Sequence, residues 1–305
     1  MKVFSSLTAA STGELKGCAI VLGNFDGMHL GHRALFAEAA KHGLVAALTF
    51  QPHPGKVLQP QLAPKLISTQ ARKLELLEAA GVQAVIVQPF SMEYARTTPA
   101  EFEAALFDGV GAKTIVVGYD FTYGSKRAGT VKTLEVAAAS RGAKVQVVNA
   151  VSLEGVVVSS SKVREYVLDG RVEAAARLLG RPFDIDGVVV RGAGRGRTIG
   201  FPTANIDTLN ELRPAPGVYA LRVRVDDRWV AGAANIGVKP TFGGGEVTIE
   251  AHLLDFTGDL YGRTLRLQFI ERLRGEQRFA SVDELKSQIA RDIEAARSAI
   301  ARVGA

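Results

Sequence analysis

The sequence predicts an α/β domain built on a parallel sheet, followed by a small, mostly antiparallel β-barrel with a C-terminal helix. Up to residue 182, short apolar runs alternate with helical patterns, as in a parallel sheet covered on both faces. From residue 183, apolar and polar residues alternate in at least five short segments, as in the strands of a small barrel. The length of 305 residues suits two domains. We therefore expect domains at residues 1–182 and 183–305.

The first strand and helix enclose the most informative stretch of the chain. Residues 18–22 are apolar and predict a buried strand, and residues 32–40 predict a helix that ends by Gly43. The segment between them reads Gly-Asn-Phe-Asp-Gly-Met-His-Leu-Gly-His, from Gly23 to His32. A glycine turn between a strand and a helix exposes backbone N–H groups at the helix N-terminus, which bind phosphate. His29 and His32 are three residues apart, so both imidazoles can face one ligand.

The rest of the first domain continues the alternation of strands and helices. Residues 51–55 contain two prolines and predict a loop, in which His53 either faces a nucleotide or only shapes the chain. A capping box with proline at the first helical position begins at Thr98. We expect strands at 44–50, 84–88, 114–117 and 145–148, and helices at 70–80, 99–107, 132–140 and 172–179.

Ligands of such a sheet bind at the carboxyl ends of its strands. The opening motif and residues 118–124 both lie at such ends. Near residue 160, three serines precede a helix and can present hydroxyl and N–H groups to an anion, and Arg164 can bind phosphate with two hydrogen bonds. Residues 29–32 resemble the His-x-Gly-His motif of nucleotidylyltransferases, and this resemblance implies in-line attack of a substrate phosphate on the α-phosphorus of ATP. His29 and His32 would stabilise the α-phosphate, and Arg164 would hold the departing pyrophosphate.

In the second domain, the expected strands are short and regularly spaced. Asp226-Asp227 marks a hairpin turn, and a capping box at Ser281 opens the last helix. We expect strands at 185–190, 219–225, 229–233, 248–254 and 265–270. The apolar face of the last helix should pack on the barrel, and consists of Val282, Leu285, Ile289, Ile293 and Ile300.

Residues 196–205 form the informative stretch of the barrel. Glycines there let the backbone approach phosphate closely, and Pro202 favours an extended bend that places Thr203 and Asn205 on one face. A hydroxyl and an amide oxygen suit Mg²⁺, which also keeps waters and shares substrate phosphates. The alternative is a glycine-rich hairpin with a polar edge.

Both informative stretches resemble signatures of known families. The His-x-Gly-His motif is that of nucleotidylyltransferases, and its longer form from Gly23 looks like that of bacterial FAD synthetases. The Pro-Thr-Ala-Asn tract at 202–205 resembles riboflavin kinases, and the likeness continues at 217–219, 235–237, 240–242, 249–256 and 259–262. The whole chain is therefore similar to the bacterial bifunctional riboflavin kinase and FMN adenylyltransferase family. This resemblance implies a Rossmann-like nucleotidylyltransferase domain at 1–182 and a riboflavin kinase domain at 183–305.

The resemblance also implies roles for particular residues. Glu250 would be the base for the ribityl 5′-hydroxyl. The alternation of Glu250 with Ile249 and Ala251 also permits an outward-facing charge, and from the same pattern we expect His252, on the same face, to be structural. Thr203 and Asn205 would bind Mg²⁺ and ATP phosphates, and Asp120 and Phe121 would bind FMN. The residues expected to bind nucleotide are Gly23, Asn24, Phe25, Asp26, Gly31, Ser160, Gly200, Thr203 and Asn205.

Two positions depart from the family pattern. Tyr123 stands where phenylalanine is usual and should add a hydroxyl at the flavin side, and Ser161 replaces a threonine but keeps its hydroxyl.

We therefore expect an enzyme of FAD biosynthesis. The C-terminal domain would make FMN from riboflavin and ATP, and the N-terminal domain would make FAD and pyrophosphate from FMN and ATP, both with Mg²⁺. The alternatives are a monofunctional adenylyltransferase whose barrel only binds flavin, and a flavin-sensing or nucleic-acid-binding regulator with decayed sites.

Composition limits the possible partners and location. No P-loop motif is present, and the one cysteine, Cys18, excludes an internal disulfide. The net charge of +6 comes from scattered residues, so we expect small-molecule substrates rather than nucleic acid. The start lacks the pattern of a signal peptide, and no apolar run is long enough to span a bilayer. We expect a cytoplasmic protein with no membrane partner, as a monomer or weak homo-oligomer.

Overall fold

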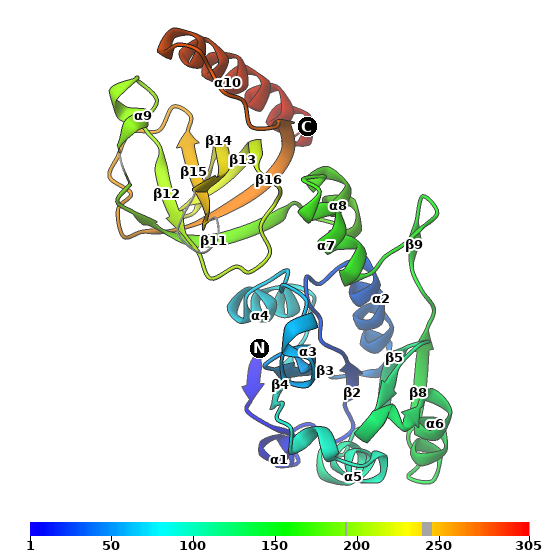
Figure 1. Ribbon diagram of the computed structural model, residues 1–305. Coiled ribbons are helices and arrows are strands. Elements are labelled where there is room, and N and C mark those ends of the chain that lie inside the picture. The colour runs from blue at the N-terminus through cyan, green and yellow to red at the C-terminus, as the bar shows by residue number, and fades with distance from the viewer. Residues whose placement is uncertain (193, 240–245, 305) are drawn as a thin grey trace. The chain divides into compact units, whose positions relative to one another are not determined.

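The computed structural model describes residues 1–192, 194–239 and 246–304 (Figure 1). The chain forms two compact units: Met1–Lys65 with Gln70–Ser159, and Leu66–Thr69 with Ser160–Ala305. The segment 240–242, which contributes to the riboflavin kinase resemblance, lies outside the described residues.

The first unit is built on a parallel sheet, as the alternation of strands and helices predicts. Each neighbouring pair in this sheet is parallel, with Val21 of the central strand beside Ala47 on one side and Val116 on the other. The six strands stand in the order β1 (Lys2–Phe4), β4 (Ala84–Pro89), β3 (Val45–Gln51), β2 (Ala19–Leu22), β5 (Thr114–Gly118) and β8 (Lys144–Val148). The edge strand β1 has only three residues, too few for a readable pattern.

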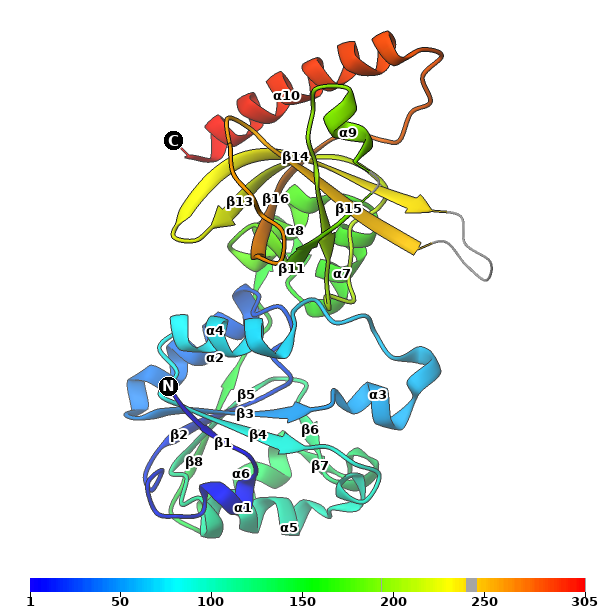
Figure 2. The same ribbon diagram turned by 90° about the vertical axis from the view of Figure 1, so that its left-hand side faces the viewer.

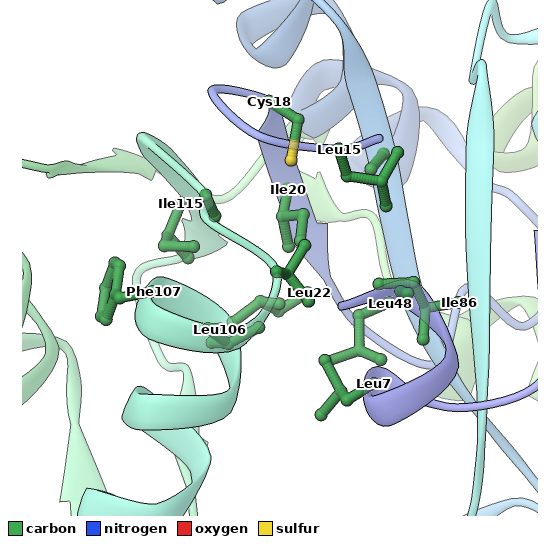
Figure 3. Packing of buried hydrophobic residues seen from close by; sticks show 14 of the residues in the cluster. Leu7, Leu15, Cys18, Ile20, Leu22, Leu48, Ile86, Leu106, Phe107 and Ile115 are labelled. Atoms are coloured by element: carbon green, nitrogen blue, oxygen red, sulfur yellow. The ribbon is translucent and has the colours of Figure 1, made fainter. Parts of the chain in front are cut away.

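Helices cover both faces of this sheet, because successive residues of the apolar strands point to opposite faces. Ile20 and Leu22 of β2 pack with α1 (Leu7–Ala10), α5 (Pro99–Ala104), the π-helical turn η4 (Ala105–Gly109) and α6 (Val131–Ala139). Figure 3 shows part of this layer, with Leu106 and Phe107 approaching Ile115 and Leu22. Ala19 and Val21 pack on the other face, against α2 (Leu30–Ala39) and α4 (Gln70–Ala79). Figure 2 shows these helix layers above and below the strands.

The expected helix boundaries are largely confirmed. Thr98 and Glu101 form the predicted capping box, and the left-handed Gly43 (φ 99°) follows the 3₁₀ turn η1 (Ala40–His42) after α2. The expected loop at 51–55 is wrong at its end, because Pro54 begins the short helix α3 (Pro54–Leu58). Proline is favoured at the first helical position, where no N–H is needed.

The remaining elements of the first unit are short. They are the turns η2 (Pro60–Leu62), η3 (Tyr94–Arg96) and η5 (Ser125–Arg127), and the paired strands β6 (Thr122–Tyr123) with β7 (Gly129–Thr130) and β9 (Ser152–Leu153) with β10 (Val156–Val157).

The second unit contains a closed barrel in which every neighbouring pair of strands is antiparallel. The five expected strands are all present. The sixth, β12, has four residues and lies in the glycine-rich stretch, so its alternation is too short to recognise. The order around the barrel is β11 (Phe183–Val190), β12 (Ala204–Asp207), β15 (Glu246–Leu253), β14 (Arg228–Lys239), β13 (Gly217–Val225) and β16 (Thr264–Arg274).

Helices complete the second unit. α7 (Ser160–Leu168) and α8 (Val172–Leu179) precede the barrel, and α8 ends at the left-handed Gly180 (φ 65°) as expected. A short helix, α9 (Arg195–Thr198), lies in the glycine-rich stretch. Leu66 also belongs to this unit: its N–H donates to Glu211 at 3.0 Å, and its carbonyl accepts from the N–H of Leu212 at 3.2 Å.

The last helix, α10 (Val282–Gly304), lies against β13, β14 and β16. Its buried Ala296 and Ala299 pack with Ala220 and Ile270 of the barrel. Ile300 joins this cluster as expected, whereas Val282 is 55% exposed, so the expectation that it packs on the barrel is wrong. Val282 is the first residue of the helix, where the chain has not yet reached the barrel cluster. Within the part of the chain that the structure describes, no helix combines the length and the apolar character needed to span a bilayer.

Candidate active sites

The two histidines of the His-Leu-Gly-His motif lie stacked at the N-terminus of α2. His29 is the N-cap residue, and its Nδ1 accepts a hydrogen bond from the N–H of His32 at 3.3 Å. The two rings are nearly parallel, with centroids 3.7 Å apart and planes at 16°. Because Nδ1 is the acceptor, neutral His29 carries its proton on Nε2. That nitrogen can donate to a phosphate oxygen.

Neighbouring residues fix this stack in place. A Cβ on Gly31 would lie 3.1 Å from the His29 ring, so the glycine gives the imidazole room to fold over the helix. The buried Phe25 ring meets His32 edge-on, with centroids 5.5 Å apart and planes at 80°. It also lies beneath Gly23, where a Cβ would be 2.8 Å from the ring. A side chain at either glycine would therefore require an aromatic ring of this site to shift.

The surroundings favour a neutral His32. Burial lowers the pKa of His32 well below its ordinary value, and the nearby His29 and Lys73 lower it further. Among the described residues, its buried Nδ1 has no hydrogen-bond partner. A buried polar atom beside a helix N-terminus is suited to an anionic ligand that supplies the missing partner.

A pocket of about 290 Å³ opens beside the histidines, at the carboxyl ends of β2, β5 and β8. This is the edge of the sheet at which the sequence predicts ligand binding. Seven of the expected site residues line it: Gly23, Phe25, His29, Gly31, His32, Asp120 and Phe121. Two others do not. The Asn24 carbonyl accepts from the Thr49 hydroxyl at 3.1 Å, and Asp26 is buried with only 2% of its surface exposed.

Tyr123, whose hydroxyl the sequence predicts at the flavin side, does not line this pocket. Tyr123 is buried, and its hydroxyl hydrogen-bonds Glu103 of α5 and, at 3.2 Å, Thr133 of α6. Burial, and secondarily the bond to Glu103, raise the pKa of Tyr123 to about 12. Its ring stacks on Phe121, with centroids 5.8 Å apart. Tyr123 thus supports the pocket wall from behind.

The remaining expected residues of this domain lie in other settings. His53 caps α3, its Nδ1 accepting from the N–H of Gly55 at 3.1 Å, which favours the interpretation that it shapes the loop. Ser160 and Arg164 lie on α7 in the second unit, and both side chains are half-buried.

In the barrel, strand register brings two of the expected residues together. Asn205 of β12 is directly paired with Glu250 of β15, and Glu250 is paired on its other side with Asn235 of β14. Directly paired residues project from the same face of a sheet. A carboxylate therefore lies between two amides.

Two pockets meet at Thr203, the residue before β12. One has a volume of about 360 Å³ and is lined by Glu250 and Asn235, by Phe279, and by apolar residues of α10 including Ile289 and Ile293. The other, of about 380 Å³, is lined by Pro202, Ala204 and the loop residues Gly258, Asp259, Leu260 and Tyr261, with others. Thr203 lines both pockets.

Local contacts hold this segment in place. His252 donates from Nδ1 to the Pro202 carbonyl at 2.7 Å, consistent with the structural role expected for it. A Cβ on Gly192 would lie 2.1 Å from the Asn205 amide nitrogen, so the Asn205 side chain lies against the backbone there. Gly200 adopts a left-handed conformation (φ 91°) and lines neither pocket.

The oxygen donors of Thr203 and Asn205 are of the kind that Mg²⁺ binds. Among the described residues, no group of three or more His, Cys, Asp or Glu could hold a metal by itself. The Thr203 hydroxyl and the Asn205 amide oxygen are neutral ligands, and Mg²⁺ commonly takes few protein ligands and shares substrate phosphates.

Sequence reasoning missed three charged residues near the sites. Lys73 of α4 is 5% exposed and lies on the helix face that carries the buried Leu76 and Leu77. The sequence pattern that could have indicated its burial is the spacing of Lys73, three and four residues before the core leucines Leu76 and Leu77. In the barrel, Arg274 of β16 makes three hydrogen bonds of 2.8–3.1 Å with the buried Asp292 of α10. Both residues line the 360 Å³ pocket.

Two family models match the chain, one in its N-terminal part and one in its C-terminal part, in the order that the sequence predicts. A family model described as FAD synthetase matches residues 11–162, and one described as riboflavin kinase matches residues 179–300.

Curated relatives match along nearly the whole chain. A bifunctional riboflavin kinase/FMN adenylyltransferase from Pseudomonas fluorescens is 39% identical, covering 93% of this chain and 94% of the relative. The protein of that name from Escherichia coli K12 is 38% identical, with 97% of both covered, and that from Bacillus subtilis is 37% identical, with 90% and 89% covered. A solved structure from Streptococcus pneumoniae, described as a macrolide-efflux protein, is 34% identical with a TM-score of 0.89, covering 97% of this chain and 98% of its own.

Proposed function

The chain belongs to the bifunctional riboflavin kinase/FMN adenylyltransferase family, and on that premise we propose which residues carry each of its two reactions. The protein is an enzyme of FAD biosynthesis that converts riboflavin to FMN and FMN to FAD, with ATP as co-substrate. We assign FMN adenylyltransfer to residues 1–182 and riboflavin phosphorylation to residues 183–305. The extents of the two family matches support this division.

In the kinase reaction, Glu250 accepts the proton of the ribityl 5′-hydroxyl as that oxygen attacks the γ-phosphorus and ADP leaves. The flavin takes the 360 Å³ pocket, whose aromatic and aliphatic walls suit a flat ring system. The nucleotide takes the neighbouring 380 Å³ pocket. The observation that carries this proposal is that Thr203 lines both pockets, so the two substrates would meet beside Glu250.

Thr203 and Asn205 would hold Mg²⁺ together with the ATP phosphates. Bound there, the ion would neutralise charge on the transferring group. Pairing with Asn205 and Asn235 keeps the Glu250 carboxylate directed into this face of the barrel, and the bond from His252 keeps Thr203 in place through Pro202.

In the adenylyltransferase reaction, an FMN phosphate oxygen attacks the α-phosphorus of ATP, and pyrophosphate leaves. His29 donates from Nε2, and His32 with the first N–H groups of α2 completes a set of donors toward the α-phosphate. Gly23, Phe25 and Gly31 shape the pocket around the nucleotide, and Asp120 and Phe121 contact the flavin. Ser160 and Arg164 bind the other ATP phosphates, as the family resemblance implies.

Two alanine variants test this assignment. His29→Ala should reduce FAD formation from FMN by about a hundredfold or more, because it removes a donor to the reacting phosphate, and should leave FMN formation unchanged. Glu250→Ala should do the reverse, since the hydroxyl loses its base. The measurement is chromatography of flavins after incubation with riboflavin or FMN, ATP and Mg²⁺.

The two variants control for each other, because each activity reports on a different pocket of the same chain. Loss of both activities in either variant would contradict the two-site assignment. FAD formation that survives in His29→Ala would remove the histidine pair from the adenylyltransferase site.

A further inference from the structure

The turn that carries the histidine pair has an unusual backbone. Phe25 (φ 50°), Gly27 (φ 83°) and Met28 (φ 44°) all adopt left-handed conformations within four residues. Such conformations cost of order 1 kcal/mol or more for each residue other than glycine, and persist only where surrounding contacts impose them. Some other part of the first unit must therefore hold this turn.

The buried residues beneath the turn form a polar chain. The Lys73 ammonium donates a long hydrogen bond of 3.5 Å to the Thr49 hydroxyl, and Thr49 in turn donates to the Asn24 carbonyl at 3.1 Å. Thr49 is fully buried at the end of β3, and Lys73 is 5% exposed on α4. The chain thus links a helix and a strand to the backbone of the turn.

Opposite charges accompany this chain. Asp26, in the middle of the turn, is 2% exposed, and its charge partly offsets the burial that lowers the pKa of Lys73. A buried charge is tolerated when an opposite charge lies near it. Lys73 is also close enough to lower the pKa of His32, so the same ammonium interacts with both the turn and the imidazole.

We propose that Lys73 is a positioning residue for FMN adenylyltransfer: through Thr49 and Asp26 it holds the Gly23–His29 turn in the shape that stacks His29 on His32. This rests on the proposed role of the histidine pair. Lys73 does not line the pocket beside the histidines, so it acts through the turn rather than by touching substrate.

The first test replaces Lys73 by methionine, which keeps the length of the side chain and removes its charge. Adenylyltransfer should slow by at least about tenfold, mainly in kcat, because misplaced donors weaken transition-state contacts more than substrate binding. Riboflavin phosphorylation should stay unchanged. Lys41→Met is the matched control, since Lys41 is an exposed lysine of the same unit paired with Glu38.

A second pair of variants tests the link through Thr49. Thr49→Val removes the hydroxyl at nearly constant volume, and Thr49→Ser keeps it. The valine variant should slow adenylyltransfer and the serine variant should not, whereas a role in packing alone would make serine the worse of the two, because it removes a buried methyl group.

The double variant Asp26→Asn with Lys73→Met tests the charge pairing and guards against loss of folding in the single variant. Removing both charges leaves no uncompensated buried ion, so the double variant should be faster than Lys73→Met by about threefold or more. A double variant no faster than the single one would overturn the pairing.

Nitrogen chemical shifts of labelled histidine separate this proposal from the reaction it serves. The chain has five histidines, and His42, His53 and His252 serve as internal references. In Lys73→Met, the imidazole signals of His29 and His32 should move and the other three should not. Unmoved signals with unchanged kcat would overturn the proposal. Signals that move as expected while His29→Ala retains full FAD formation would instead overturn the proposed role of the histidines.

Discussion

Gly31 lies between the two histidines in the sequence, and its lack of a side chain leaves room for the His29 ring. A Cβ there would lie 3.1 Å from the His29 ring and 3.6 Å from the Val158 carbonyl, so the ring would have to shift. Gly31→Ala should therefore slow FAD formation by about tenfold or more, although alanine favours the helix.

Steady-state kinetics with FMN and ATP measure this effect, and thermal unfolding provides the control. We expect an unfolding temperature equal to or above that of the unmodified protein. A slow variant that is also unstable would point to general disruption rather than to the imidazole stack.

His32 should make stability depend on pH. Its pKa in the folded protein lies well below the ordinary value of 6.5, so below about pH 6.5 the unfolded chain binds a proton that the folded chain does not. Stability should therefore fall as pH falls through this range, by up to about 1.4 kcal/mol per pH unit from this group.

The measurement is the free energy of urea unfolding at several pH values for the unmodified protein and for His32→Asn. Asparagine does not titrate, so the difference between the two curves isolates His32. Parallel curves between about pH 7.5 and 5.5 would contradict the assignment.

Residue-level prediction succeeded where a motif carried its own geometry. The spacing of His29 and His32 predicts that both imidazoles face one ligand. The structure brings the two rings together because His29 is the N-cap residue and its ring folds over the first turn of α2. Tyr123 and Lys73 were beyond this reasoning, since their hydrogen-bond partners Glu103 and Thr49 are distant in sequence. The sequence does not decide the role of His53, because a histidine at this position could either cap α3 or contact a nucleotide.

At the scale of elements, α10 is attached to the barrel by charge as well as by apolar packing. Arg274 binds Asp292 through both carboxylate oxygens, and Gln288 donates to the same carboxylate at 2.8 Å. Arg274 and Asp292 line the proposed flavin pocket. The position of α10 therefore depends on Asp292.

Asp292→Asn should raise the KM for riboflavin and reduce the free energy of unfolding by about 1–3 kcal/mol, because Arg274 loses its charged partner in a buried setting. FAD formation from supplied FMN should not change. Glu294→Gln is the matched control on the same helix, since its side chain is 77% exposed. An unchanged KM in Asp292→Asn would show that α10 does not shape the flavin pocket.

Elements with a distinctive sequence signal were predictable, and those without one were not. Strand β13 has an alternating pattern over nine residues, and α5 begins with a capping box. Strands β1 and β12 have three and four residues, and exist because longer strands beside them offer free hydrogen-bonding edges. Helix α3 was not predicted because its first residue, Pro54, follows another proline closely, and such a pair favours a loop.

At the scale of the whole molecule, periodicity located the change in architecture, whereas the compact units divide elsewhere. The pattern changes at residue 183, where β11 begins. The compact units divide at Ser159, because α7 and α8 cluster with the barrel. Such contacts join residues that are far apart in the sequence, as in the hydrogen bond from the Arg272 N–H to Glu173 at 3.0 Å. The hydrophobic periodicity of a short segment therefore does not reveal them.

The four residues Leu66–Thr69 have a consequence for how such a protein can evolve. The polypeptide passes between its two units three times, since this segment belongs with residues that follow Ser159. A gene rearrangement that exchanged everything after Ser159 for a foreign kinase half would leave Leu66 without Glu211 and Leu212, which now receive and supply its backbone hydrogen bonds. A successful exchange of the second half would therefore have to replace residues 66–69 as well, which favours keeping both activities in one gene.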